Sequence, residues 1–186
     1  WVHIGGSTLT LDSEWRNACD SAARTVVDAG GRLSFDPNLR IELMDLDHAR
    51  ELCFPYIRRS SLFAPSESEI TALFREDVDT SIDRALEMGS QLVAVKRGEK
   101  GCIIASEHSR CVVPGFAVGC KDPTGAGDTF DAAAMFAFTL GLDNESIGVF
   151  ANAAAAMSTL KLGPMEGCPT RDEVGDFLIS RGRADI

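Results

Sequence analysis

Short apolar runs rich in β-branched residues alternate along the chain with longer stretches typical of helices. The clearest strand is residues 91–96 (QLVAVK), which lies between Gly89 and Gly98. The pattern predicts strands at residues 1–4, 32–35, 61–64, 91–96, 101–105 and 110–113. It predicts helices at residues 12–29, 47–59, 81–88, from 125 onward with breaks at 141–143 and near 163–164, and at 170–179.

Several helix boundaries have local signals. Asp12 or Ser13 can cap the first predicted helix. Ser66 followed by Glu69, and Thr170 followed by Glu173, have the spacing of a capping box. These signals predict helices that start directly after residues 66 and 170.

Strands that alternate with helices favour an α/β fold, with a doubly wound and mostly parallel sheet flanked by helices. The chain has 186 residues, of which 45% are hydrophobic, so it can bury a sizeable core. We therefore expect residues 1–186 to form a single α/β domain.

The formal net charge of −10 argues against binding to nucleic acid or to an anionic membrane. The longest apolar run, residues 132–140, is too short to cross a bilayer. The charge does not exclude an anionic ligand, because backbone N–H groups can hold a phosphate whatever the global charge.

The six cysteines are scattered and form no C-x-x-C pair, so reduced thiols and a cytoplasmic location are expected. None of the three histidines stands beside another ligand at zinc spacing.

Residues 121–130 (KDPTGAGDTF) carry the chemistry. Gly125, Ala126 and Gly127 are small residues at the point where a helix is expected to begin, and the first N–H groups of a helix form a ready anion site. Asp128 follows directly and suits a base that takes a proton from a hydroxyl. The plainer alternative is that Asp128 only favours the helix N-terminus and the glycines only turn the chain.

The sequence DPTGAGDTF resembles the C-terminal signature of the ribokinase-like (pfkB) carbohydrate kinases. Further segments match the same family in the same order, so the resemblance covers essentially the whole chain. They are residues 35–40 (FDPNLR, its D-P-N-x-R element), 65–69 (PSESE, its N-x-x-E), 96–101 (KRGEKG, its G-x-x-G), and 151–156 (ANAAAA) with 162–164 (LGP). The D-P-N-x-R element is seen especially in 2-keto-3-deoxygluconate kinases and fructokinases.

The resemblance implies a catalytic role for Asp128 as general base on the substrate hydroxyl. It implies that the amides of Gly125, Ala126 and Gly127 form an anion hole for the moving γ-phosphoryl group. Arg40 is implied as a substrate residue together with Asn38, because a guanidinium suits a sugar-acid carboxylate.

The resemblance also implies an ATP site and two cation sites. The ATP site would comprise Gly98 and Gly101 against the nucleotide, Lys96 facing the ribose or a phosphate, Asn152 near the adenine, and Ser66. Glu69 would help to organise Mg²⁺ and its waters. A monovalent-cation site, with K⁺ as the candidate, would comprise the loop around Asp122 and Thr124 with carbonyls near Ser158, Lys161 and Gly163.

Each assignment has a plainer alternative. In these alternatives, Asn152 would point to solvent, and Ser66 with Glu69 would form only a capping box. Arg40 would pair with a nearby acid, and Lys96 would be an ordinary solvated lysine. Asp131, three residues past Asp128, is expected to be a surface acid.

The chain departs from the family pattern in two places. Ser66 replaces the asparagine of N-x-x-E, which weakens the contribution of that motif. Family members also carry a segment before the strand at residues 1–4, which supplies a sugar-binding glycine pair and a lid through which many relatives dimerise. We therefore expect this chain to be the C-terminal portion of a sugar kinase, incomplete and with little or no activity by itself. A homodimer is the candidate assembly of the full-length protein.

The expected function is ATP-dependent phosphorylation of a sugar hydroxyl, with 2-keto-3-deoxygluconate or a related ketose or sugar acid as the substrate. The expected ligands are ATP, Mg²⁺ and a small sugar. A fructokinase and a truncated, non-catalytic nucleotide-binding module are the alternatives. A dinucleotide-binding dehydrogenase is disfavoured, because no G-x-G-x-x-G follows the first strand.

Overall fold

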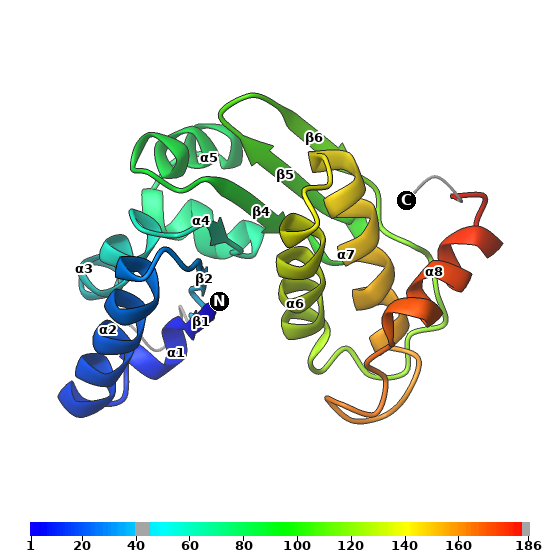
Figure 1. The fold of residues 1–186 in the computed structure, drawn as a ribbon, viewed down its shortest axis with the longest axis horizontal. Helices are drawn as coiled ribbons and strands as arrows, with labels where there is room; N and C mark the ends of the chain where they lie inside the picture. Colours follow the sequence, from blue (N-terminus) through cyan, green and yellow to red (C-terminus); the bar gives the residue numbers. More distant parts are fainter. Residues whose placement is uncertain (40–44, 184–186) are drawn as a thin grey trace. The chain divides into compact units, whose positions relative to one another are not determined.

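The computed structural model describes residues 1–39 and 45–183. Figure 1 shows its helices and strands in chain order. The six strands are hydrogen-bonded to one another in the order β1 to β6. They are β1 (Val2–Gly5), β2 (Leu33–Asp36), β3 (Leu62–Phe63), β4 (Leu92–Lys96), β5 (Cys102–Ser106) and β6 (Arg110–Val113).

Strands β1 to β4 pair in parallel, which confirms the predicted sheet. Each of these pairs is joined by a crossover that contains helices. Only three residues join β5 to β6, so these two neighbours form a hairpin, as the pattern of residues 101–113 indicated.

The helices match the pattern closely in the C-terminal part of the chain and less closely in the N-terminal part. They are α1 (Gly6–Leu9), α2 (Ser13–Asp28), α3 (Leu46–Ile57), α4 (Glu67–Phe74), α5 (Val78–Glu87), α6 (Ala126–Thr139), α7 (Asn144–Ser158), α8 (Arg171–Ser180) and the 3₁₀ turn η2 (Gly98–Lys100).

Capping explains where several helices begin. Both expected capping boxes are present, at Ser66 with Glu69 and at Thr170 with Glu173. Two features differ from the sequence prediction. The one-turn helix α1 was not predicted, and α5 starts three residues before the expected position because the Asp77 side chain accepts a hydrogen bond from the Thr80 N–H.

The chain forms two compact units. The first comprises Trp1–Val95 and Ala105–His108, and the second comprises Lys96–Ile104 and Ser109–Ile186. In the first unit, Phe35 on β2 stacks on Tyr56 of α3 and on Phe63 of β3, with ring centroids 5.3 and 6.1 Å apart. These contacts fix the end of β2 against its neighbours. The expectation of a single domain stays a prediction.

The core of the second unit depends on a close contact between helix α7 and the hairpin. A Cβ atom on Gly148 of α7 would lie 2.7 Å from Val113, 3.0 Å from Ile104 and 3.1 Å from Cys102. Only glycine lets the helix backbone approach β5 and β6 this closely. Val113, Ile104 and Cys102 are all buried.

Among the described residues, no helix has both the length and the apolar character needed to cross a membrane.

The burial of the cysteines gives a chemical test of this fold. Burial raises the pKa of the Cys53 and Cys102 thiols to about 12, whereas Cys120 and Cys168 are exposed. The thiolate is the reactive form, so at pH 8 we expect a thiol reagent to modify Cys120 and Cys168 rapidly and Cys53 and Cys102 only after unfolding. Peptide mass mapping of the modified protein checks this. Rapid labelling of Cys53 or Cys102 in the native protein would contradict the described packing.

Candidate active site

Backbone turns at the carboxyl ends of β1 and β2 bring the D-P-N element into place in the first unit. A Cβ atom on Gly6 would collide with the Pro37 carbonyl, so the two turns are in direct contact. Asn38 has a φ of 42° and its N–H donates to the Asp36 carboxylate at 3.1 Å. Asn38 is thus held by a local turn. Arg40, predicted as a substrate residue, lies outside the described residues.

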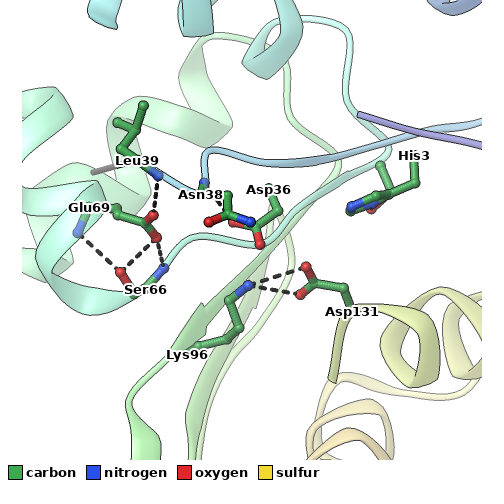
Figure 2. Close-up of polar contacts among 9 residues, drawn as sticks. His3, Asp36, Asn38, Leu39, Ser66, Glu69, Lys96 and Asp131 are labelled. Atoms are coloured by element: carbon green, nitrogen blue, oxygen red, sulfur yellow. Dashed lines mark hydrogen bonds and ion pairs between the residues drawn. The ribbon is translucent and has the colours of Figure 1, made fainter. Parts of the chain in front are cut away.

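Glu69 ties this turn to helix α4 (Figure 2). Its Oε2 accepts hydrogen bonds from the Ser66 N–H at 2.7 Å and from the Ser66 hydroxyl at 2.6 Å, and its Oε1 accepts from the Leu39 N–H at 2.7 Å. Glu69 is 8% exposed. The interpretation of Ser66 and Glu69 as only a capping box is therefore incomplete, because Glu69 also binds a residue 30 positions away.

These bonds limit what Glu69 can do for a metal ion. A carboxylate offers about four lone-pair sites, and three of them are taken. The remaining site suits a metal-bound water rather than direct ligation, which fits an indirect role for Glu69. Across the described residues, no group of three or more histidine, cysteine or acidic side chains could hold a metal ion.

In the second unit, helix α6 begins with an uncapped turn. Gly125 has a φ of 80°, and a Cβ atom there would collide with the Pro164 carbonyl, so this position requires glycine. Gly125 also offers no side chain to cap the helix. Every other described helix of eight or more residues has a side-chain cap.

Two backbone donors of this turn are available for a ligand. The Ala126 N–H donates to the Pro123 carbonyl and the Thr129 N–H to the Gly125 carbonyl. The N–H groups of Gly127 and Asp128 lie between them, at the positive end of the helix dipole. Asp128 is exposed beside these donors. The arrangement can bind an anion and places a carboxylate next to it.

Asp131 corrects a sequence prediction. It is not a surface acid but is 1% exposed, and it forms an ion pair with Lys96, the last residue of β4 (Figure 2). The Lys96 Nζ lies 3.1 Å from Oδ1 and 3.2 Å from Oδ2. The interpretation of Lys96 as a solvated lysine is also wrong, because its side chain is 15% exposed. A buried carboxylate needs such a partner.

The signal for this pair was present in the sequence. Asp131 is the only charged residue in the run FDAAAMFAF, residues 130–138. Aspartate is almost never fully buried unless it is paired, so an acid inside an apolar run is a candidate for a buried ion pair.

The G-x-x-G turn and Asn152 meet at the end of β6. Gly98 and Gly101 have φ values of 58° and 91°, and a Cβ atom on Gly101 would collide with the Val113 carbonyl. The Asn152 side chain donates to the carbonyls of Val113 and Pro114, both at 3.2 Å. Asn152 is 6% exposed, so it does not point to solvent. The structure thus brings Gly101 and Asn152 together around Val113.

The predicted monovalent-cation residues also lie partly together. The Asp122 carboxylate accepts hydrogen bonds from the Gly163 N–H at 2.9 Å and from the Thr124 N–H at 3.0 Å. Hydrogen bonds from Thr124 and from the Gly163 N–H lower the pKa of Asp122. At pH values above the ordinary aspartate pKa, the charged Asp122 carboxylate therefore holds this loop through these hydrogen bonds. The loop loses them only as the pH falls through the lowered pKa of Asp122.

The other two residues of that set are placed differently. The Ser158 hydroxyl donates to the Ala155 carbonyl within its own helix, and the predicted contribution of Ser158 is its backbone carbonyl, which this bond does not involve. Lys161 is exposed. Each Asp122 oxygen keeps unused acceptor capacity, so oxygen chemistry suited to K⁺ is present at Asp122.

Asp128 and Thr129 line a pocket of about 450 Å³ that continues along α6. Its walls are mostly apolar and include Phe136, Phe150 and Val174. They offer few hydrogen-bonding groups for a polar ligand.

Comparison with known proteins agrees with this geometry. The model for "pfkB family carbohydrate kinase" matches residues 1–171. The chain belongs to the pfkB family of carbohydrate kinases. The chain is 33% identical over 156 residues to an uncharacterized sugar kinase of Archaeoglobus fulgidus, a match that covers 83% of this chain and 61% of that protein.

Two further pfkB relatives are named fructokinases. Probable fructokinase-5 of Arabidopsis thaliana is 31% identical over 190 residues, covering 96% of this chain and 58% of the relative. The crystal structure of a Vibrio cholerae fructokinase with fructose, ADP and calcium bound has a TM-score of 0.85 and 26% identity, covering 96% of this chain and 60% of that chain. The chain thus spans about three fifths of the length of these relatives, and it has their ribokinase-like fold.

The tie between Glu69 and Leu39 can be tested by substitution. In Glu69→Gln, an amide NH₂ replaces one acceptor oxygen and faces an N–H donor, so at least one bond to a charged group is lost. We expect the free energy of unfolding to fall by about 1.5–3 kcal/mol and the Leu39 amide to exchange faster. Urea denaturation and hydrogen exchange measure these effects. Glu67→Gln is the control, because it removes the same charge from the same helix turn, and an equal effect of both variants would refute the tie.

Proposed function

We propose that this chain carries the nucleotide-binding and catalytic part of a kinase that transfers the γ-phosphoryl group of ATP to a sugar hydroxyl. The uncapped first turn of α6, with Asp128 exposed beside the free amides of Gly127 and Asp128, is the observation that supports this most directly. Membership of the pfkB family supports it independently.

In the proposed reaction, the Asp128 carboxylate accepts the proton of the sugar hydroxyl as that oxygen attacks the γ-phosphorus. The bond from the γ-phosphorus to the β,γ-bridging oxygen breaks, ADP leaves, and the products are the sugar phosphate and a proton held by Asp128. Gly125 sets the orientation of the N–H groups in the first turn of α6. These N–H groups stabilise the charge on the γ-phosphoryl group during transfer. Mg²⁺, when bound with ATP, neutralises charge on the phosphate oxygens.

The remaining residues of the ATP site shape the surroundings of the nucleotide in this proposal. Gly98 has no atom within 4 Å of an ideal Cβ position, so it leaves open surface against which a nucleotide can lie, and Gly101 lets the turn after β4 close onto Val113. Asn152 holds the carbonyls of Val113 and Pro114 and thereby fixes the border of the proposed adenine region. Glu69 would help to hold Mg²⁺ and its waters, and Asp122 with Thr124 and Gly163 holds the loop that would take K⁺.

We propose 2-keto-3-deoxygluconate or a related ketose or sugar acid as the substrate, held by Asn38 and Arg40. The support is the D-P-N-x-R sequence, in which a guanidinium follows a rigid turn. Fructose is the competing substrate, since two of the compared relatives are named fructokinases. The non-catalytic nucleotide-binding module remains the alternative function.

The Asp128→Asn variant distinguishes a sugar kinase from a non-catalytic nucleotide-binding module. Asparagine keeps the size of the side chain but does not accept the proton, so we expect turnover to fall about 100-fold or more while MgATP affinity is unchanged. Coupled kinase assays with 2-keto-3-deoxygluconate and fructose, together with calorimetric MgATP titrations, measure both quantities. Undiminished turnover in the variant would refute Asp128 as the base. MgATP binding without turnover in either form would support the module.

A further inference from the structure

We propose that Asp131 is a positioning residue of this kinase: it fixes the Lys96 ammonium against the first turn of α6, beside the anion site. The proposal rests on the proposed function of that turn. Lys96, Asp131 and α6 all belong to the second unit of the chain.

The position of the Lys96 ammonium relative to α6 carries the argument. An ideal Cβ atom on Gly127 would lie 3.7 Å from the Lys96 Nζ, so the ammonium rests against the backbone of the turn that offers the free amides. Asp131 lies one helical turn beyond Gly127, four residues on, and therefore on the same face of α6. The lysine is thus held between the anion site and the carboxylate.

The geometry of the pair restricts a flexible side chain. Lysine carries a point charge on a four-carbon stem and occupies many rotamers unless it is held. Here both carboxylate oxygens contact the ammonium, at 3.1 and 3.2 Å, and the two side chains are only 15% and 2% exposed. Asp131 therefore determines where the positive charge sits.

Stability alone is a weak reason for this pair. Replacing a buried ion pair by neutral residues of similar volume is often neutral or stabilising, because burying two charges carries a large desolvation penalty. A fixed cation beside a phosphate site, in contrast, acts on charge that develops during transfer without reorganising. Asp131 also balances the charge of Lys96, so the pair can stay buried when no phosphate is bound.

The proposal predicts different effects on turnover and on ATP affinity. In Asp131→Asn the ammonium keeps its charge but loses the paired carboxylate contacts at 3.1 and 3.2 Å. Displacement of a charged group by about 1 Å can lower a rate by about 100-fold, so we expect kcat to fall by roughly 10- to 100-fold while the KM for ATP does not rise. Glu87→Gln, which removes an acid from the exposed pair with Arg84, is the matched control and should leave both constants unchanged.

A double variant distinguishes positioning from a merely structural role. Lys96→Met combined with Asp131→Asn leaves no buried unpaired charge, so we expect its thermal stability to exceed that of either single variant. Its kcat should nevertheless stay as low as that of Lys96→Met alone, because Asp131 acts only through Lys96. Recovery of kcat together with stability would overturn the proposal. If Asp131→Asn does not fold, the double variant alone decides between these outcomes.

The wild-type protein separates this proposal from the function on which it rests. Sugar-dependent ATP turnover in the wild type, with kcat unchanged in Asp131→Asn, overturns the positioning role and leaves the kinase intact. No sugar-dependent turnover in the full-length wild-type kinase overturns the proposed function and this proposal with it.

Discussion

Gly125 holds the start of helix α6 in a conformation that leaves the first-turn amides uncapped, and the candidate site depends on this constraint. Its φ of 80° and the contact between its backbone and the Pro164 carbonyl leave no room for a side chain. A capping side chain would have satisfied one of the helix donors internally. Because Gly125 supplies none, the amides of Gly127 and Asp128 are available to a ligand.

Each of the two compact units contains one acidic side chain that connects distant segments of that unit. In the first, Glu69 joins the D-P-N turn to the start of α4 through Leu39 and Ser66. In the second, Asp131 joins the end of β4 to α6 through Lys96. In both units, a buried acidic side chain connects residues far apart in the sequence. Hydrogen bonds from other residues take the place of the water that would otherwise solvate its carboxylate. The acids thus order backbone turns.

Much of the fold could be predicted from the sequence because local signals and the global fold agree. Both capping boxes, the parallel strands and the hairpin follow from short-range patterns. The pairing of Asp131 with Lys96 and the bond from Leu39 to Glu69 were missed, since both join residues more than 29 positions apart. Helix α1 was missed because its single turn has no capping side chain. The roles assigned to individual site residues stay predictions.

The affinity of Gly127→Ala for MgATP tests the central claim most directly. A methyl group at this position would contact the Lys96 Nζ at an ordinary 3.7 Å, and alanine favours a helix, so the variant should be as stable as the wild type. The methyl group would nevertheless occupy the surface that a phosphate oxygen approaches. We predict that MgATP affinity falls about tenfold or more while adenosine affinity is unchanged. A stable Gly127→Ala variant that binds MgATP as tightly as the wild type would contradict the account.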